Sequence, residues 1–237
     1  MQNAYRPPSA LGLIPPVVKN LLIINGLAFL AQLVFRMQAG DVGIGPAEEW
    51  LALWPAGVPR DVPRGEFVGL FWPWQVVTSA FLHGDFFHLL FNMFGLWMFG
   101  GGVERALGSA RFAGLYAACV LGASLLQLGV ISYPFLGDAL PAGLYGPTLG
   151  ASGGVLGVLA AFAVLHPDEP IFLLFLPVPI PAKWFVLGYA AVDLFGGFGA
   201  YASNVAHFAH LGGMLTGALL LLYWRGRLPV KPRARVA

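Results

Sequence analysis

The sequence predicts an all-α membrane protein with six transmembrane helices, and three observations lead to this prediction. Hydrophobic residues make up 58% of the 237-residue chain and charged residues only 10%, whereas a soluble domain carries about 25% charged residues. Several apolar runs are long enough to cross a bilayer, and polar loops separate them. The fourth run is short and follows a loop rich in Gly and Pro, which predicts a helix that begins below the membrane surface.

Each predicted span is an apolar run bounded by charged residues, prolines or glycines. The loop at about 37–73 is long and extramembrane, and its tryptophans favour the membrane interface. Residues 171–181 are apolar but contain three prolines, so they suit an interfacial connector better than a span. We expect one six-helix membrane domain at 17–225, between a tail at 1–16 and a basic tail at 226–237. The spans are predicted at about 17–35, 86–102, 112–131, 151–165, 184–195 and 205–224.

The number of spans and the charges of the loops and tails predict how the chain is oriented in the membrane. A charged loop is expected at 103–111, a Gly- and Pro-rich loop at 132–149, and a Gly-rich loop from Gly196 to the last span. Six spans place both termini on one side, and that side holds ten Lys and Arg residues against three on the other. Such a bias marks the cytoplasmic side. The small size and the basic tail suit a prokaryotic plasma (inner) membrane with both termini cytoplasmic.

The composition also excludes several classes of function. A net charge of +2 is too weak and too scattered to indicate a nucleic-acid partner. The single cysteine, Cys119, excludes an internal disulfide framework and a multi-cysteine zinc site. The predicted partners are the lipid bilayer and other membrane proteins.

Four polar side chains within the spans lie at one predicted depth. At about 1.5 Å per residue, the run opened by Ser152 is ~21 Å long where a span needs ~30 Å, so Ser152 lies ~20–24 Å above the inner border. The same rise places His210 at ~22 Å, His88 at ~24 Å and Asn92 at ~18 Å. Polar groups inside spans are costly and usually mark function.

Small residues predict close contact between the fourth and sixth helices, since small stripes let membrane helices approach. That contact would bring His210 within hydrogen-bond reach of Ser152. The small residues are Gly153 and Gly157 in the fourth run and Gly213 and Gly217 in the sixth.

This arrangement predicts a serine nucleophile. A serine hydroxyl needs a base, and a neutral imidazole suits that task near pH 7. We therefore expect Ser152 to act as the nucleophile and His210 as its general base. His88, Asn92 and the backbone N–H of Ser152 are expected to stabilise the oxyanion. No carboxylate is obviously placed to orient His210, so a dyad is predicted.

Other assignments stay open. His207 could be taken for the base, although it lies further from the glycine stripe than His210. The roles of His83 and Asp193 are open. A zinc site built from the histidines lacks the H-E-x-x-H pattern and a matching acid, so neither a metal nor another cofactor is predicted.

The segment at 150–154 also matches the nucleophile elbow G-x-S-x-G, and the order Ser152, Asp193, His210 fits a hydrolase triad. That motif needs a strand before the serine. The predicted spans argue against such a soluble α/β fold.

Taken together, these residues resemble those of the rhomboid family of intramembrane serine proteases. The resemblance covers about residues 17–225. It implies a rhomboid-like six-helix bundle with a short, recessed fourth helix, a Ser152–His210 dyad, and His88 and Asn92 at the oxyanion. It also implies cleavage in or near a transmembrane segment of a protein substrate, without a cofactor. The motifs are HLLFN at 88–92, GASG at 150–153, and AHLGG at 209–213 followed by Gly217.

Two departures from the family pattern concern the loops. Gln75 follows Trp74 where many members have Arg, and Ala106 stands where many have Arg.

The alternative function is a non-catalytic membrane protein that binds or chaperones client transmembrane helices, and a transporter is a weaker third option.

Overall fold

The computed structural model describes residues 14–39, 44–58, 69–133, 146–173, 176–199 and 206–230. Most of the two predicted tails, at 1–13 and 231–237, lies outside the described residues. The same holds for parts of the predicted loops, at 40–43, 59–68, 134–145, 174–175 and 200–205.

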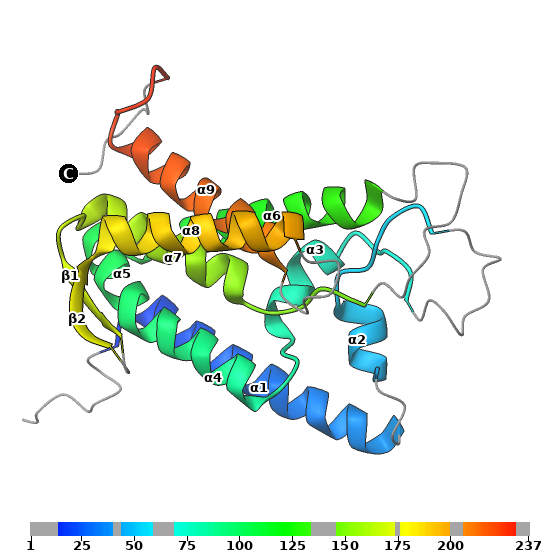
Figure 1. Ribbon diagram of the computed structural model, residues 1–237. Coiled ribbons are helices and arrows are strands. Elements are labelled where there is room, and N and C mark those ends of the chain that lie inside the picture. Colours follow the sequence, from blue (N-terminus) through cyan, green and yellow to red (C-terminus); the bar gives the residue numbers. More distant parts are fainter. Residues whose placement is uncertain are drawn as a thin grey trace, which may run out of the picture.

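The described chain is mainly helical (Figure 1). A 3-10 turn at Ser79–Phe81 follows α3, and a π-helical turn at Leu96–Gly100 joins α4 to α5. The elements are α1 (Pro16–Ala39), α2 (Pro46–Leu51), α3 (Gln75–Thr78), α4 (Phe86–Gly95), α5 (Gly101–Leu107), α6 (Ser109–Ser132), α7 (Ser152–Leu165), β1 (Pro170–Leu173), β2 (Leu176–Pro181), α8 (Ala182–Gly199) and α9 (His207–Trp224).

Among the described residues, three helices are long and apolar enough to cross a membrane, judged by length and composition: Pro16–Met37, Phe86–Leu107 and Ser109–Ser132. The helix α7 is apolar but has only 14 residues. A mainly helical membrane fold therefore agrees with the prediction, whereas the number of six spans stays a prediction.

The helix α7 lies at the centre of the bundle, and ten of its 14 residues are buried. It contacts α6, α8, α9 and the α4–α5 helix. In Figure 1, α1 and the α4–α5 helix run side by side along the lower edge of the view, and α6, α8 and α9 lie above them. Ser152 is thus the first residue of a helix that is largely buried in the bundle.

Glycines allow α9 to lie almost backbone to backbone against α6 and α7. A methyl group on Gly213 would collide with the carbonyl oxygen of Gly153, and one on Gly217 with that of Gly157. A methyl group on Gly212 would lie 2.6 Å from a carbonyl oxygen of α6. The close contact predicted from the small residues is present.

Parts of two predicted loops are helical instead. The second predicted span continues through residues 103–107 and ends at Gly108, which has a φ of 78°. The helix α8 continues through Gly196 and Gly197 to Gly199. These glycines allow close packing, because a methyl group on Gly196 would lie 2.7 Å from the ring of His207.

The predicted connector at 171–181 forms a small antiparallel hairpin of β1 and β2, with Ile171 opposite Ile180. Its prolines lack a backbone N–H, and such residues are tolerated in edge strands. Both strands of a two-stranded hairpin are edges, so the prolines do not prevent pairing. The hairpin is the only sheet within the described residues.

Candidate active site

Ser152 is the first residue of α7, and the backbone turns sharply before it. Gly150 has a φ of 127°, which is a left-handed conformation that favours glycine. A Cβ on Gly150 would lie 2.7 Å from His88 Nε2 and 3.7 Å from Ser152 Oγ. Glycine at this position therefore permits the turn and leaves space between the two side chains.

Backbone contacts fix the segment that leads to Ser152. Leu53 and Thr148 form a reciprocal bridge with N···O distances of 2.8 and 2.9 Å. The N–H of Gly150 donates to the carbonyl oxygen of Ser79 at 2.9 Å. The residues after α2 and after α3 thus hold the turn in place.

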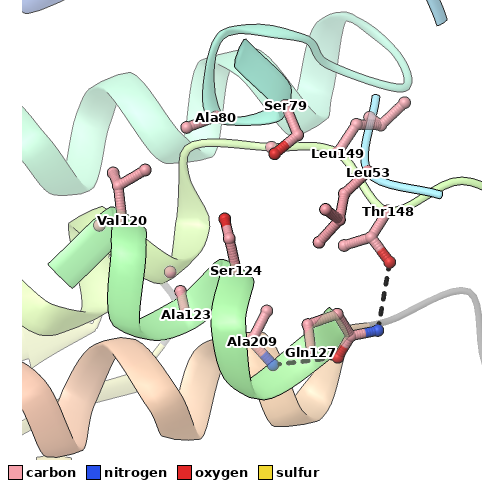
Figure 2. Close-up of a pocket in the computed structure, with 13 residues that line it drawn as sticks. Leu53, Ser79, Ala80, Val120, Ala123, Ser124, Gln127, Thr148, Leu149 and Ala209 are labelled. Carbon is pink, nitrogen blue, oxygen red and sulfur yellow. Dashed lines mark hydrogen bonds between the residues drawn. The ribbon is translucent and has the colours of Figure 1, made fainter. Parts of the chain in front are cut away.

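Gln127 of α6 joins this segment to α9 (Figure 2). Its Nε2 donates to Thr148 Oγ1 at 3.1 Å, and its Oε1 accepts the N–H of Ala209 at 3.2 Å. A small cavity lies beside it, with Ser79 and Ser124 among its lining residues. The sequence reasoning missed Gln127, whose signal is an amide inside an otherwise apolar helix.

The helix α9 brings His210 to Ser152. The distance from His210 Nε2 to Ser152 Oγ is 2.8 Å, which is a hydrogen-bond distance. His210 is buried and Ser152 is half-buried. The structure therefore brings together the two residues expected to be base and nucleophile, while their catalytic roles stay a prediction.

A carboxylate that the sequence leaves unassigned lies behind His210. Asp193 of α8 approaches His210 Nδ1 with Oδ2 at 3.1 Å and Oδ1 at 3.3 Å. The expectation that no carboxylate is placed to orient His210 therefore differs from the structure. Helical periodicity within one span does not reveal which neighbouring helix a residue faces. The available signal is that Asp193 is the only charged residue of the span predicted at 184–195.

His207 lies one turn before His210 and faces α8. Its Nδ1 is 2.6 Å from Asp193 Oδ1. The histidine at hydrogen-bond distance from Ser152 is His210. This geometry favours His210 over His207 as the partner of the serine.

His88 lies against the turn at Gly150. Asp85 caps α4 by accepting the N–H of His88 at 2.9 Å, and the N–H of Gly84 donates to His88 Nδ1 at 3.3 Å. A neutral imidazole that accepts at Nδ1 carries its proton on Nε2. Because Nε2 is the ring nitrogen beside Gly150, its N–H is available near Ser152.

Asn92 is less directly placed. It is buried, and its Nδ2 donates to the carbonyl oxygen of His88 at 2.8 Å. Among the hydrogen bonds of the described residues, none joins Asn92 to Ser152 or His210. Its role at the oxyanion stays a prediction.

His83 precedes α4, is fully buried and packs against His88. Gln32 of α1 accepts the N–H of His83 at 3.0 Å and donates to its carbonyl oxygen at 2.9 Å. The ring packs edge-on against His88 with centroids 5.2 Å apart. Burial, with a smaller contribution from His88, lowers the pKa of His83 to about 4, so the ring is neutral near pH 7.

The structure shows the surroundings of Gln75 and Ala106, the two residues that depart from the family pattern. Gln75 is buried, and its Oε1 accepts the N–H groups of Trp54 at 3.3 Å and Trp72 at 3.1 Å. Its Nε2 donates to the carbonyl oxygen of Leu70 at 3.0 Å. A glutamine amide therefore braces the first loop, and Ala106 is exposed.

Four of the five histidines form two pairs, with His83 and His88 around the start of α4 and His207 and His210 on α9, and His166 follows α7. Within the part of the chain that the structure describes, no group of three or more His, Cys, Asp or Glu residues is placed to hold a metal ion.

Sequence comparison finds relatives among mitochondrial proteins. The chain is 37% identical over 145 residues to Rhomboid protein 1, mitochondrial, of Saccharomyces cerevisiae. It is 33% identical over 162 residues to the presenilin-associated rhomboid-like protein, mitochondrial, of Mus musculus. It is also 33% identical over 155 residues to RHOMBOID-like protein 12, mitochondrial, of Arabidopsis thaliana. The matches cover 61–65% of this chain but only 40–44% of these relatives.

The predicted location is contradicted by these matches. All three relatives are named as mitochondrial proteins, so the prediction of a prokaryotic plasma membrane is wrong. An excess of Lys and Arg on one side reports orientation within a bilayer. It does not distinguish one membrane from another, and chain size is no better guide.

The sequence profile of the Rhomboid domain matches residues 71–227, which is more than half of the chain. The matched region contains Ser152, His210, His88 and Asn92. This chain therefore belongs to the rhomboid family.

Proposed function

We propose that this chain is an intramembrane serine endopeptidase that hydrolyses peptide bonds in or near the transmembrane segments of membrane proteins. The observation that carries the proposal is the 2.8 Å distance between Ser152 Oγ and His210 Nε2. Family membership supports it. The names of the relatives favour a mitochondrial membrane as the place of action.

The chemistry follows from this pair. His210 Nε2 takes the proton of Ser152 Oγ as the oxygen attacks the carbonyl carbon of the substrate. His210 then gives the proton to the departing amine, which leaves an acyl group on Ser152. Water, deprotonated by His210, releases the acyl group as a carboxylic acid. Such acid–base assistance contributes typically about 10²–10⁴-fold in rate.

The oxyanion formed on attack would lie at the start of α7. The first N–H groups of a helix have no partner within it and face the positive end of the helix dipole. The Nε2–H of His88 lies beside Gly150. We assign the oxyanion to these donors, with Asn92 as a further one. Each donor of this kind is worth about 10²–10³-fold in rate.

We further propose that six helices cross the membrane: α1, α4–α5, α6, α7, α8 and α9. The helix α7 is ~21 Å long at 14 residues, which is short of the ~30 Å hydrocarbon core. Ser152 is then recessed below the membrane surface. A substrate must present an unwound segment there, because the amides of an intact helix are shielded.

The proposal is tested with purified protein in liposomes that contain a single-span test substrate. Ser152→Ala and His210→Ala should each abolish detectable cleavage, and Ser152→Ala should also abolish labelling by a fluorophosphonate. Matched controls are Ser109→Ala at the start of α6 and His166→Ala after α7, which should both cleave as the wild type does. Undiminished cleavage by Ser152→Ala or His210→Ala would refute the proposed roles.

The alternative of a non-catalytic protein that holds client helices makes the opposite prediction. A protein that only binds would co-purify with the intact test substrate, and its Ser152 would not be labelled by the fluorophosphonate.

A further inference from the structure

Asp193 and the two histidines of α9 form a polar cluster behind the serine. We propose that Asp193 is a positioning residue that holds His210 in the base-competent tautomer, and that His207 keeps the Asp193 carboxylate in place. The inference rests on the proposed function and extends its dyad by one carboxylate from α8.

The first argument is the hydrogen-bond chemistry of the carboxylate. An ionised carboxylate only accepts hydrogen bonds, so a histidine nitrogen that contacts it must carry a proton. Both Asp193 oxygens approach His210 Nδ1, at 3.1 and 3.3 Å. A neutral His210 with its proton on Nδ1 leaves Nε2 unprotonated. That nitrogen is 2.8 Å from Ser152 Oγ and can accept the hydroxyl proton.

The second argument is the position of Asp193 on its helix. From residue 182 to residue 198, the only buried residues of α8 are Ala182, at its start, and Asp193. Only 4% of the Asp193 side chain is exposed. A buried carboxylate is costly unless it is paired. The one residue that the middle of α8 buries is therefore the one that contacts both histidines.

The third argument is the position of the His207 ring between Asp193 and Gly196. Its Nδ1 lies 2.6 Å from Asp193 Oδ1, which is closer than either distance to His210. Gly196, three residues after Asp193, leaves space for this ring, because a methyl group there would lie 2.7 Å from it. The spacing places Asp193 and Gly196 on the same face of α8. His207 is thereby held against the carboxylate, which stays directed at α9.

Tyr189 completes the surroundings of the base. It lies four residues before Asp193 and thus on the same helix face. Its ring centroid is 6.3 Å from that of His210, at 51° between the ring planes. The imidazole of His210 therefore meets an aromatic ring and a carboxylate from one helix and Ser152 from another.

A merely structural pairing of Asp193 with His207 is the competing explanation. It predicts that loss of the carboxylate lowers stability while each folded molecule keeps its turnover rate. The positioning role predicts a fall in kcat for molecules that remain folded, with a much smaller change in KM.

The experiment compares Asp193→Asn with the wild type in the same liposomes. The concentration of folded protein in each sample is determined from the amplitude of its thermal unfolding transition. The values of kcat and KM are then measured separately. We expect kcat to fall by about 10²–10⁴-fold, the upper figure being that of a buried triad aspartate changed to Asn, with KM within about threefold. The matched control is Asp168→Asn, because Asp168 is exposed and pairs with Lys183 outside the site, and it should keep the wild-type kcat.

A second measurement on the unaltered protein covers the case in which Asp193→Asn does not fold. Nitrogen-15 NMR of histidine-labelled protein should show neutral His210 with its proton on Nδ1. His210 is identified by the signal lost in His210→Ala.

Two results would overturn the inference: a proton on Nε2 of neutral His210, or folded Asp193→Asn with wild-type kcat. Absence of cleavage and labelling by the wild type would instead refute the proposed function. The failures of the two proposals are thus distinguishable.

Discussion

The helices α7 and α8 both contribute to the candidate site, but they are fixed in different ways. Ten of the 14 residues of α7 are buried, and glycines bring its backbone against α9. The helix α8 exposes large side chains along most of its length, among them Leu187 and Val192, and buries Asp193. Tight apolar packing therefore holds the helix of the nucleophile, whereas α8 meets the core through partly buried side chains such as Phe185 and Val186 and meets α9 through the polar contacts of Asp193.

This difference predicts two kinds of sensitivity. Close-packed interiors cannot absorb added volume without strain, so changes in the α7–α9 contact should damage folding and activity together. Changes on the exposed face of α8 should leave stability nearly unchanged, and changes beside Asp193 should affect turnover. Variants matched in chemistry but placed on the two helices can test the comparison.

The largest effect on activity is expected for Gly213→Val. The new side chain would collide with the carbonyl oxygen of Gly153 and separate α9 from α7, which moves His210 away from Ser152. We expect loss of fluorophosphonate labelling and a fall in the free energy of unfolding of at least about 1–3 kcal/mol. Gly114→Val on α6 is the control, since nothing lies within 4 Å of a Cβ there. Normal labelling of Gly213→Val would contradict the tight packing of α7.

A matched leucine pair should change stability without acting on the Ser152–His210 contact, with a large loss for one variant and almost none for the other. Leu159 of α7 is 3% exposed and Leu187 of α8 is 59% exposed. Leu159→Ala should destabilise by about 2–5 kcal/mol, and Leu187→Ala by less than about 0.5 kcal/mol. Chemical or thermal unfolding in detergent measures both. Equal losses would show that α8 is packed as firmly as α7.

The smallest change in stability, with a selective change in rate, is expected for Gly196→Ala. The methyl group would press on the ring of His207 and shift the Asp193 carboxylate that His207 holds. We expect kcat to fall severalfold at nearly constant unfolding temperature. Gly188→Ala, on the same helix with no neighbour within 4 Å, should keep the wild-type kcat. A parallel fall in both variants would mean that α8 responds to any substitution.

The pairing of Ser152 with His210 follows from the sequence because both lie on apolar helices with a known rise per residue. Their depths can be counted from charged helix ends, and the small residues indicate which helices touch. The contact of Asp193 could not be derived in this way, since it depends on the rotation of α8 about its axis. A helix with apolar residues on every face carries no periodic signal for that rotation.

The helix ends and the hairpin show the same limit. Gly196 and Gly197 predict a loop when read alone, yet they are helical because rings of α9 occupy the space beside them. The prolines after residue 170 predict a connector but not its structure, which is a hairpin of two short edge strands. In both cases a contact with another segment decides the local structure, and single-sequence patterns do not contain that contact.

The separation of Ser152 from His210 by 58 residues along the chain has a consequence for biosynthesis. A ribosome that adds about 5–20 residues per second completes the serine ~3–12 s before the histidine. Throughout that interval the growing chain holds a hydroxyl without its base, which is a poor nucleophile. On the proposed function, a nascent chain cannot cut neighbouring proteins at the insertion site, and a chain truncated before α9 is released as an inert product.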